Sequence, residues 1–287
     1  MEKIKCTLCG EIMKEYNLVK KSAIKYEDCI RKCINCRIGA SNAKNAPTFI
    51  YKDYSRNIPQ DFLTNLEKTL DNANNESNRS NKKIKFGYST SEDAFSWIFI
   101  RYFIENNQLE ELKNILELKD GIEEILMWGV PQITTIDYQK SLRNICKDLE
   151  EPNHYYSEPD IIVISKSEII FIEVKLKSSN DKKEIKDDKY FVGDYYANWA
   201  MAQNSKCYEL VRNWTIGNLF AEKMEKSMRL INLAPKSTLN NDEQLGVFGS
   251  SLNNPKGFQK MSWEYVFSKS PGVKALLQKR YDTIVKK

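Results

Sequence analysis

The sequence predicts an α/β fold preceded by a small metal-binding module. Three observations support this prediction: two Cys-x2-Cys pairs near the N-terminus, a helical pattern that changes to two adjacent β-branched runs, and a further helix and strand after them. With 41% hydrophobic and 29% charged residues, the chain has the composition of a globular protein that buries a core. Its 287 residues suit one large fold with one accessory module.

The cysteine module contains two Cys-x2-Cys hooks, 23 residues apart, which consist of Cys6, Cys9, Cys33 and Cys36. Each hook presents two thiolates, and four thiolates fit one tetrahedral zinc ion. Burial alone is too weak to stabilise a unit of residues 1–70, whereas bound zinc supplies folding free energy. We therefore expect structural zinc in a module that resembles a zinc ribbon. Disulfide or redox pairs are the alternatives, and Cys29 could replace one ligand.

Positive charge is concentrated in the same region. Residues 1–60 contain 12 Lys and Arg against 6 Asp and Glu, whereas residues 61–287 contain 32 against 33. A local positive field attracts polyanions such as DNA, through salt-sensitive phosphate contacts. The alternative is a structural lid or an oligomer contact with solvated lysines. The residues concerned are Lys20, Lys21, Lys25, Arg31, Lys32 and Arg37.

The Asn- and Ser-rich segment 71–84 separates two parts of different composition and predicts a linker. A larger domain is expected over residues 85–287. It opens with a capping box, in which Thr90 is the N-cap and Asp93 follows three residues later. A buried helix should follow, with an aromatic stripe packed on a sheet at Phe95, Phe99 and Phe103.

A β-hairpin is expected after two further helices, over Gln108–Leu118 and Tyr138–Leu149. Its strands are the apolar runs Ile161–Ile164 and Ile169–Val174. Both faces of each strand are apolar, which indicates a sheet with both faces covered by other elements. With an even loop around positions 166 and 167, the residue numbers of each cross-strand pair add up to 333. This register places position 160 opposite position 173. The sequence then predicts a helix around Leu210 to Met224 and a strand, MRLINL, after it.

Three charged residues meet at one end of this predicted hairpin. Asp160 lies opposite Glu173, and Lys175 points to the same face as Glu173. Facing carboxylates repel unless a divalent cation lies between them, and Mg²⁺ prefers oxygen ligands. A nearby lysine can hold water and offset the charge of a phosphorane. The pattern predicts metal-assisted phosphodiester hydrolysis; the alternative is a solvated strand end with a turn aspartate.

Glu92 lies in the first turn of the buried helix, where a carboxylate could reach the sheet and assist in binding metal. Acidic residues also favour helix N-termini because of the helix dipole, which is the alternative explanation.

These residues resemble the PD-(D/E)xK motif of the restriction-endonuclease-like superfamily. The block PD at 159–160 is followed, after twelve residues, by EVK at 173–175. The flanking segments SEDAFSW and YELVRNW are similar to segments of bacterial proteins of this type, so the similarity covers Thr90 to Pro235. The resemblance implies an αβββαβ core with a mixed sheet, and Gln132–Asp137 is the candidate for the strand before Asp160.

The resemblance also implies roles for individual residues. Asp160 and Glu173 match the metal ligands, Lys175 matches the catalytic lysine, and Glu92 matches the acidic residue of the first core helix. The leading hypothesis is therefore a magnesium-dependent DNA endonuclease with a restriction or defence role. Alternatives are a non-catalytic zinc-dependent nucleic-acid-binding adapter, and a nuclease for RNA or structured DNA. Double-strand cleavage by a one-site enzyme would favour a homodimer, which no residue demonstrates.

Other classes of protein are excluded or disfavoured. His154 is the only histidine, so sites built from two or more imidazoles are excluded, and in its polar loop it receives no role. The N-terminus lacks the apolar region of a secretory signal, and the most apolar stretch, Ala94 to Ile104, is too short to cross a bilayer. A cytoplasmic protein with no membrane partner is expected.

Overall fold

The structure is a computed structural model and describes residues 3–16, 22–43, 47–177, 180, 183–186 and 188–285. The predicted α/β class is confirmed, because the chain forms two sheets with helices around them. The small sheet is antiparallel, in the order β1 (Lys14–Glu15), β2 (Arg31–Cys33), β3 (Ile38–Ala40) and β4 (Phe49–Tyr51). The large sheet contains β5 (Ile122–Met127), β6 (Val130–Pro131), β7 (Ile161–Ser165), β8 (Glu168–Val174), β9 (Ser227–Ala234) and β10 (Phe258–Ser262).

The helices lie mainly around the large sheet. They are α1 (Leu66–Asn72), α2 (Arg79–Phe86), α3 (Glu92–Glu105), α4 (Leu109–Ile115), α5 (Tyr138–Asp148), α6 (Trp199–Asn204), α7 (Tyr208–Lys223), α8 (Lys236–Asn241), α9 (Gln244–Ser250), α10 (Trp263–Lys269) and α11 (Pro271–Val285). Short 3-10 helices are formed by Tyr26–Asp28, Tyr54–Asn57, Gln60–Phe62, Glu76–Asn78, Asp188–Tyr190, Gly193–Tyr195 and Pro255–Gly257. Within the described residues, no helix has the length and apolar character that a membrane span requires.

The large sheet is mixed. Its order is β10-β9-β8-β7-β5-β6, in which β8, β9 and β10 run parallel and the other neighbours are antiparallel. Alternate strand residues pack into two cores, one containing the apolar side chains of α3 and the other those of α7. The two helices therefore cover opposite faces of the sheet, as the doubly apolar strands predict. Along the chain, the main elements follow one another as α3, β5, β7, β8, α7 and β9.

The hairpin of β7 and β8 has the predicted register. Ile161 pairs with Ile172 and Ile164 pairs with Ile169, so the residue numbers of each pair add up to 333. At the turn, Ser165 Oγ donates to the carbonyl of Glu168 at 3.0 Å and accepts from its N–H at 3.1 Å. The prediction of this register is confirmed, because the doubly buried strands tolerate no slip.

The core strand that pairs with β7 is β5, followed by the short β6, and the candidate Gln132–Asp137 is wrong. The strand was hidden because Glu124 interrupts its apolar pattern, yet this side chain is fully buried. Its carboxylate accepts the N–H groups of Gln132, Ile133 and Thr134 at 2.8 to 3.0 Å. The predicted strand is therefore a loop folded over the buried Glu124 carboxylate.

The segment 71–84, expected to be a linker, is mostly helical in the structure. It contains the end of α1, the 3-10 helix Glu76–Asn78 and most of α2. Ala73 and Phe86 are fully buried in the core below α3, and the side chain of Asn74 donates to the carbonyl of Ser157 at 2.7 Å. The asparagines of this segment therefore serve as buried hydrogen-bonding groups as well as surface residues, which composition alone does not distinguish.

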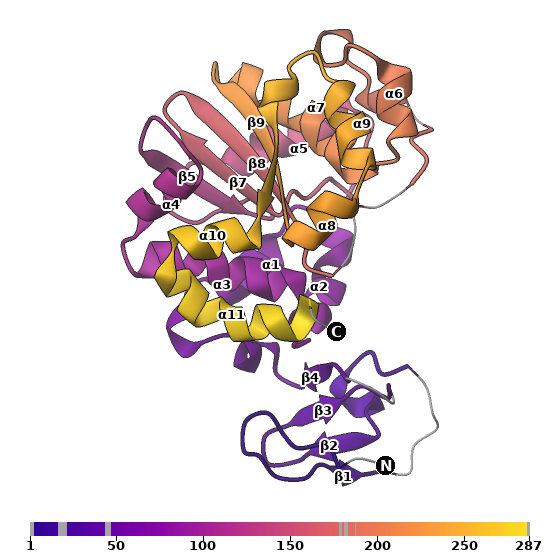
Figure 1. Cartoon of the computed structure of the whole chain (residues 1–287), viewed down its shortest axis with the longest axis vertical. Coiled ribbons are helices and arrows are strands. Elements are labelled where there is room, and N and C mark those ends of the chain that lie inside the picture. Colours follow the sequence, from indigo (N-terminus) through magenta and orange to yellow (C-terminus); the bar gives the residue numbers. More distant parts are fainter. Residues whose placement is uncertain are drawn as a thin grey trace.

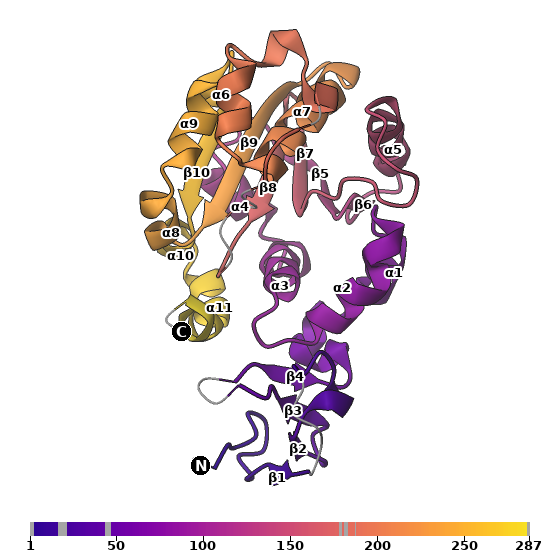
Figure 2. The ribbon, with the colours of Figure 1, turned by 90° about the vertical axis from the view of Figure 1, so that its right-hand side faces the viewer.

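The small sheet lies at one end of the molecule, below α2 and α3 in both views (Figures 1 and 2). It has its own core of Cys6, Met13, Cys33, Ile38 and Ala40. Its last strand bonds to the segment just before α3: the N–H of Tyr51 donates to the Gly87 carbonyl at 2.9 Å, and that of Phe49 donates to Ser89 Oγ at 3.0 Å. Residues 58–70 already contribute to the core of the large unit, so the small module is shorter than the expected 1–70.

Candidate functional site

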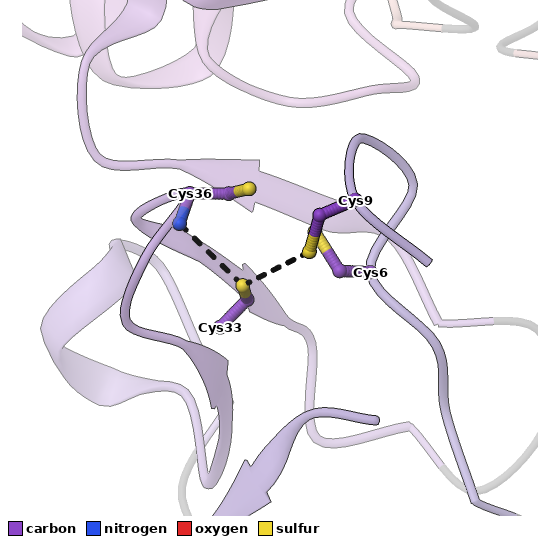
Figure 3. A group of neighbouring side chains, drawn as sticks. All are labelled: Cys6, Cys9, Cys33 and Cys36. Atoms are coloured by element: carbon purple, nitrogen blue, oxygen red, sulfur yellow. Dashed lines mark hydrogen bonds between the residues drawn. The ribbon is translucent and has the colours of Figure 1, made fainter. Parts of the chain in front are cut away.

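The four predicted cysteines lie together in the small module (Figure 3). The sulfur atoms of Cys6, Cys9, Cys33 and Cys36 all lie within 4.8 Å of one another, and those of Cys9 and Cys33 are 3.7 Å apart. Zn–S bonds of about 2.3 Å in a tetrahedron place sulfurs about 3.8 Å apart. The predicted cluster is confirmed, and its donor set fits structural zinc.

The two cysteine hooks share a local geometry. Each hook is a tight turn that ends at a residue with positive φ: Gly10 at +75° and Arg37 at +54°. In the second hook, the N–H of Cys36 points to the sulfur of Cys33 at 3.5 Å. Turns of this kind direct both side chains of a Cys-x2-Cys pair to one point.

Cys29 does not belong to the cluster. Its side chain is fully buried, and its thiol donates to the carbonyl of Lys25 at 3.6 Å. Burial raises the pKa of Cys29 to about 11. Its sulfur is not part of the group formed by the other four thiols. The alternative in which Cys29 replaces a zinc ligand is therefore not supported.

The predicted acidic and basic residues of the large unit line one pocket of about 710 Å³. The pocket lies where β8 ends, between the N-terminal ends of α3 and α7 and the polar loop before β7. Its lining includes Glu92, Asp160, Glu173 and Lys175. The structure therefore brings together all four residues that the motif predicts.

Asp160 and Glu173 lie at the open end of the hairpin. Asp160 immediately precedes β7, and its Oδ2 accepts the N–H of Val174 at 2.8 Å. Glu173 is the penultimate residue of β8 and accepts a bond from Lys175 Nζ at 2.7 Å. The second oxygen of Glu173 accepts from Asn213 of α7 at 2.8 Å.

Burial sets the electrostatics of this pocket. The pKa of Asp160 is well above its ordinary value because of burial and the neighbouring charge of Glu173. Burial also raises the pKa of Glu173, and the charge of Lys175 only partly opposes this. For Lys175, burial lowers the pKa, but the charges of Glu173 and Glu209 outweigh it and hold the pKa above its usual range. The pocket therefore holds a permanent ammonium beside two carboxylates that a further cation would help to ionise.

Glu92 bridges α3 and the end of β8. The helix begins at Glu92 with Ser91 as its N-cap, one residue later than the predicted Thr90. The carboxylate of Glu92 accepts the N–H groups of Leu176 and Lys177 at 2.7 and 3.0 Å. It therefore fixes the chain that follows Lys175, in addition to lining the pocket.

The sequence did not identify Glu209, which binds the lysine of the motif. Glu209 Oε2 lies 2.7 Å from Lys175 Nζ, so the ammonium bridges two carboxylates. Glu209 and Asn213 are four residues apart on α7 and face the same end of the hairpin. This i, i+4 pair in YELVRNW is the signal in the sequence, but the apolar face of the helix dominates the pattern there.

Lys82 was also missed, because it lies in the segment expected to be a linker. Only 5% of its side chain is exposed, and Nζ lies 3.0 Å from Asp93 and 2.7 Å from Glu158. The ammonium also lies 4.5 Å from the centre of the Trp128 ring. Lys82 therefore fastens α2 and α3 to the loop that carries Asp160.

Where the structure describes them, the basic residues of the cysteine module do not line this pocket. Arg31 donates to the carbonyls of Ser41 and Ala43, and Lys32 donates to the carbonyl of Glu27, so part of this charge is tied to local backbone. Lys20 and Lys21 lie outside the described residues. His154 contacts Glu76 at 2.7 Å and is also absent from the lining.

Comparisons with protein-family models, with curated proteins and with solved structures returned no match for this chain.

Proposed function

We propose that this protein is a magnesium-dependent endonuclease that hydrolyses phosphodiester bonds of DNA, with a restriction or defence role. The observation that carries the proposal is the meeting of Asp160, Glu173 and Lys175 in one pocket at the end of the hairpin. Glu173 and Lys175 are buried and Asp160 is half-buried beside them. Gathering these charges has a free-energy cost that a structural role does not explain.

The donor set fits magnesium. Asp160 and Glu173 offer carboxylate oxygens, which Mg²⁺ prefers. Both groups have raised pKa values, as expected of a metal site without its cation. When bound, such an ion polarises a phosphoryl oxygen and lowers the pKa of water. These two residues would hold it.

Lys175 supplies the other half of the chemistry. Its ammonium is held by Glu173 and Glu209, so its position is fixed before substrate arrives. From there it can orient the attacking water and offset the negative charge that develops on the phosphorane. Glu92 assists by fixing the backbone that follows this lysine.

The order of elements supports the same proposal. The succession α3, β5, β7, β8, α7 and β9 follows the αβββαβ order that the resemblance to PD-(D/E)xK nucleases implies. The same resemblance matches Glu92, the two acids of the hairpin and Lys175 to the family's motif residues, and these four residues line one pocket. The zinc module would add phosphate contacts outside the pocket.

The test is plasmid nicking with Mg²⁺. We expect wild type to nick supercoiled DNA, and Asp160→Asn and Lys175→Ala to lose at least 100-fold in rate, on the order of a general acid–base or charge-stabilising group. Asp148→Asn is the matched control, since Asp148 is an exposed acid at the end of α5 and outside the pocket.

The outcome separates the competing functions. A wild type that binds DNA but nicks nothing with any divalent metal contradicts the proposal and favours a non-catalytic adapter. RNA and branched DNA, offered in parallel, show whether the same site prefers another nucleic acid.

A further inference from the structure

Arg212 lies on α7, between two residues that contact the core of the site. Glu209, three residues earlier, holds Lys175, and Asn213, the next residue, donates to Glu173. Arg212 lines the same pocket. The first turns of α7 therefore direct a cation, as well as an anion and an amide, toward the end of the hairpin.

Arg212 has acidic neighbours but forms no direct ion pair within the described part of the chain. Lys175 is engaged by two carboxylates, and so is Lys82 on the opposite wall. In contrast, Arg212 makes no hydrogen bond or ion pair with the described residues, and its Nε is buried without an acceptor. A buried guanidinium nitrogen with no partner is rare in folded proteins and requires an explanation.

Two contacts keep this side chain charged and oriented. Burial lowers the pKa of Arg212, but the negative charges of Glu173 and Glu209 have the larger effect and hold this pKa above its usual value. The guanidinium carbon lies 5.7 Å from the centre of the Tyr208 ring. Stacking on a ring restricts the plane of a guanidinium while leaving its edge of N–H donors free.

From these contacts we infer that Arg212 is a phosphate-binding residue, which donates two hydrogen bonds to the non-bridging oxygens of a backbone phosphate in the pocket. The fork of a guanidinium matches two oxyanions of one phosphate, and a charge-assisted pair of this kind is stronger than a neutral hydrogen bond. The identification of the ligand as a nucleic-acid phosphodiester rests on the proposed function. Arg212 would hold the phosphate beside Glu173 and Lys175.

The experiment measures how salt weakens the binding of a short labelled DNA duplex. An Asp160→Asn background prevents cleavage. Each phosphate contact adds about one to the slope of log affinity against log salt concentration, so Arg212→Gln should reduce the slope by about one. Lys223→Gln removes the same charge from an exposed position on the same helix, about 16 Å along its axis, and should leave the slope unchanged.

Arg212→Lys separates charge from geometry. Lysine keeps the charge but cannot make the bidentate contact, so we expect an unchanged slope with affinity reduced several-fold. This variant also decides the question if Arg212→Gln fails to fold, as checked by thermal melting: undiminished affinity in Arg212→Lys would then overturn the inference.

The two proposals fail in different ways. Equal slopes for Arg212→Gln and Lys223→Gln overturn the role of Arg212, as does a wild type that binds no DNA. A wild type that nicks nothing, combined with a slope reduced only in Arg212→Gln, supports Arg212 as a phosphate ligand and contradicts the nuclease.

Discussion

At the scale of single residues, Asp160 lowers the stability of the folded protein. Its carboxyl lies in a buried position next to Glu173, and its pKa is raised accordingly. A carboxylate with a raised pKa destabilises the folded protein at neutral pH, because the unfolded chain ionises more easily. Function and stability therefore oppose each other at this position.

Asp160→Asn should raise the free energy of unfolding of the metal-free protein at pH 7.5, by on the order of 1 kcal/mol or more. The amide is neutral, and its oxygen can still accept the N–H of Val174. Because the folded pKa is raised, the stability contributed by Asp160 is fully present below the unfolded pKa of about 4 and is lost as pH rises through the folded pKa. The advantage of the variant should therefore shrink at lower pH.

Thermal melts in EDTA at pH 5 and pH 7.5 measure this difference, with Asp148→Asn as the control. Adding Mg²⁺ should raise the melting temperature of wild type and leave that of Asp160→Asn unchanged. A variant that melts below wild type at pH 7.5 without metal would show that Asp160 is stabilising as an anion, contrary to our account.

At the scale of elements, α2 is docked by one buried lysine. Lys82 pairs with Asp93 of α3 and with Glu158, two residues before Asp160. Burial lowers the pKa of Lys82, but the charges of Asp93 and Glu158 outweigh it and raise the pKa above its usual range. The ammonium is therefore permanently charged, and the position of the loop depends on it.

Lys82→Ala should destabilise the protein by about 3 to 5 kcal/mol, because it leaves the buried carboxylate of Glu158 without a counter-charge. Lys83→Ala is the matched control: the neighbouring lysine pairs with Asp71, half of whose side chain is exposed, and should cost less than about 1 kcal/mol. Urea unfolding of the three proteins measures both effects. Equal losses in the two variants would contradict the docking role of Lys82.

The elements also show how far local sequence patterns reach. The hairpin of β7 and β8 was predictable to the register, because both faces of each strand are apolar and an even loop fixes the pairing. The strand β5 and the helix α2 were not, since Glu124 and Lys82 are buried polar residues. Apart from the N–H of Ile125, the partners of these two side chains lie eight or more residues away along the chain. Local periodicity contains no information about such contacts.

The candidate site was likewise predictable only in part. The positions of Asp160, Glu173 and Lys175 follow from strand periodicity once the register is known. From the sequence, Arg212 could contact phosphate or lie on a solvated helix face, and Glu209 gives no signal of its own. Which of these holds depends on how α7 packs over the sheet. Spacing likewise identified the four cysteines, whereas the exclusion of Cys29 required its burial.

At the scale of the whole molecule, the cysteine module contacts a residue that lines the pocket. Ile50 of β4 forms a β-bridge with Tyr88, and the Tyr88 hydroxyl donates to the carbonyl of Ile24 in the same module. Tyr88 also lines the pocket. Since α3 begins only a few residues later, at Glu92, order in the module is transmitted to the site through this segment.

Loss of zinc should therefore unfold the module first and reduce nicking second. We expect Cys33→Ser to lose the zinc found in wild type, at about one ion per chain, and to show an early melting transition separate from that of the large core. Nicking should fall several-fold, because Tyr88 loses its support while Asp160 and Lys175 keep theirs.

Cys29→Ser is the matched control, since Cys29 lies four residues away and outside the sulfur cluster, and should keep zinc and activity. Metal analysis, calorimetry and the plasmid assay measure the three effects; a zinc-free Cys33→Ser protein with one unchanged transition and full activity would show that the module is independent of the site.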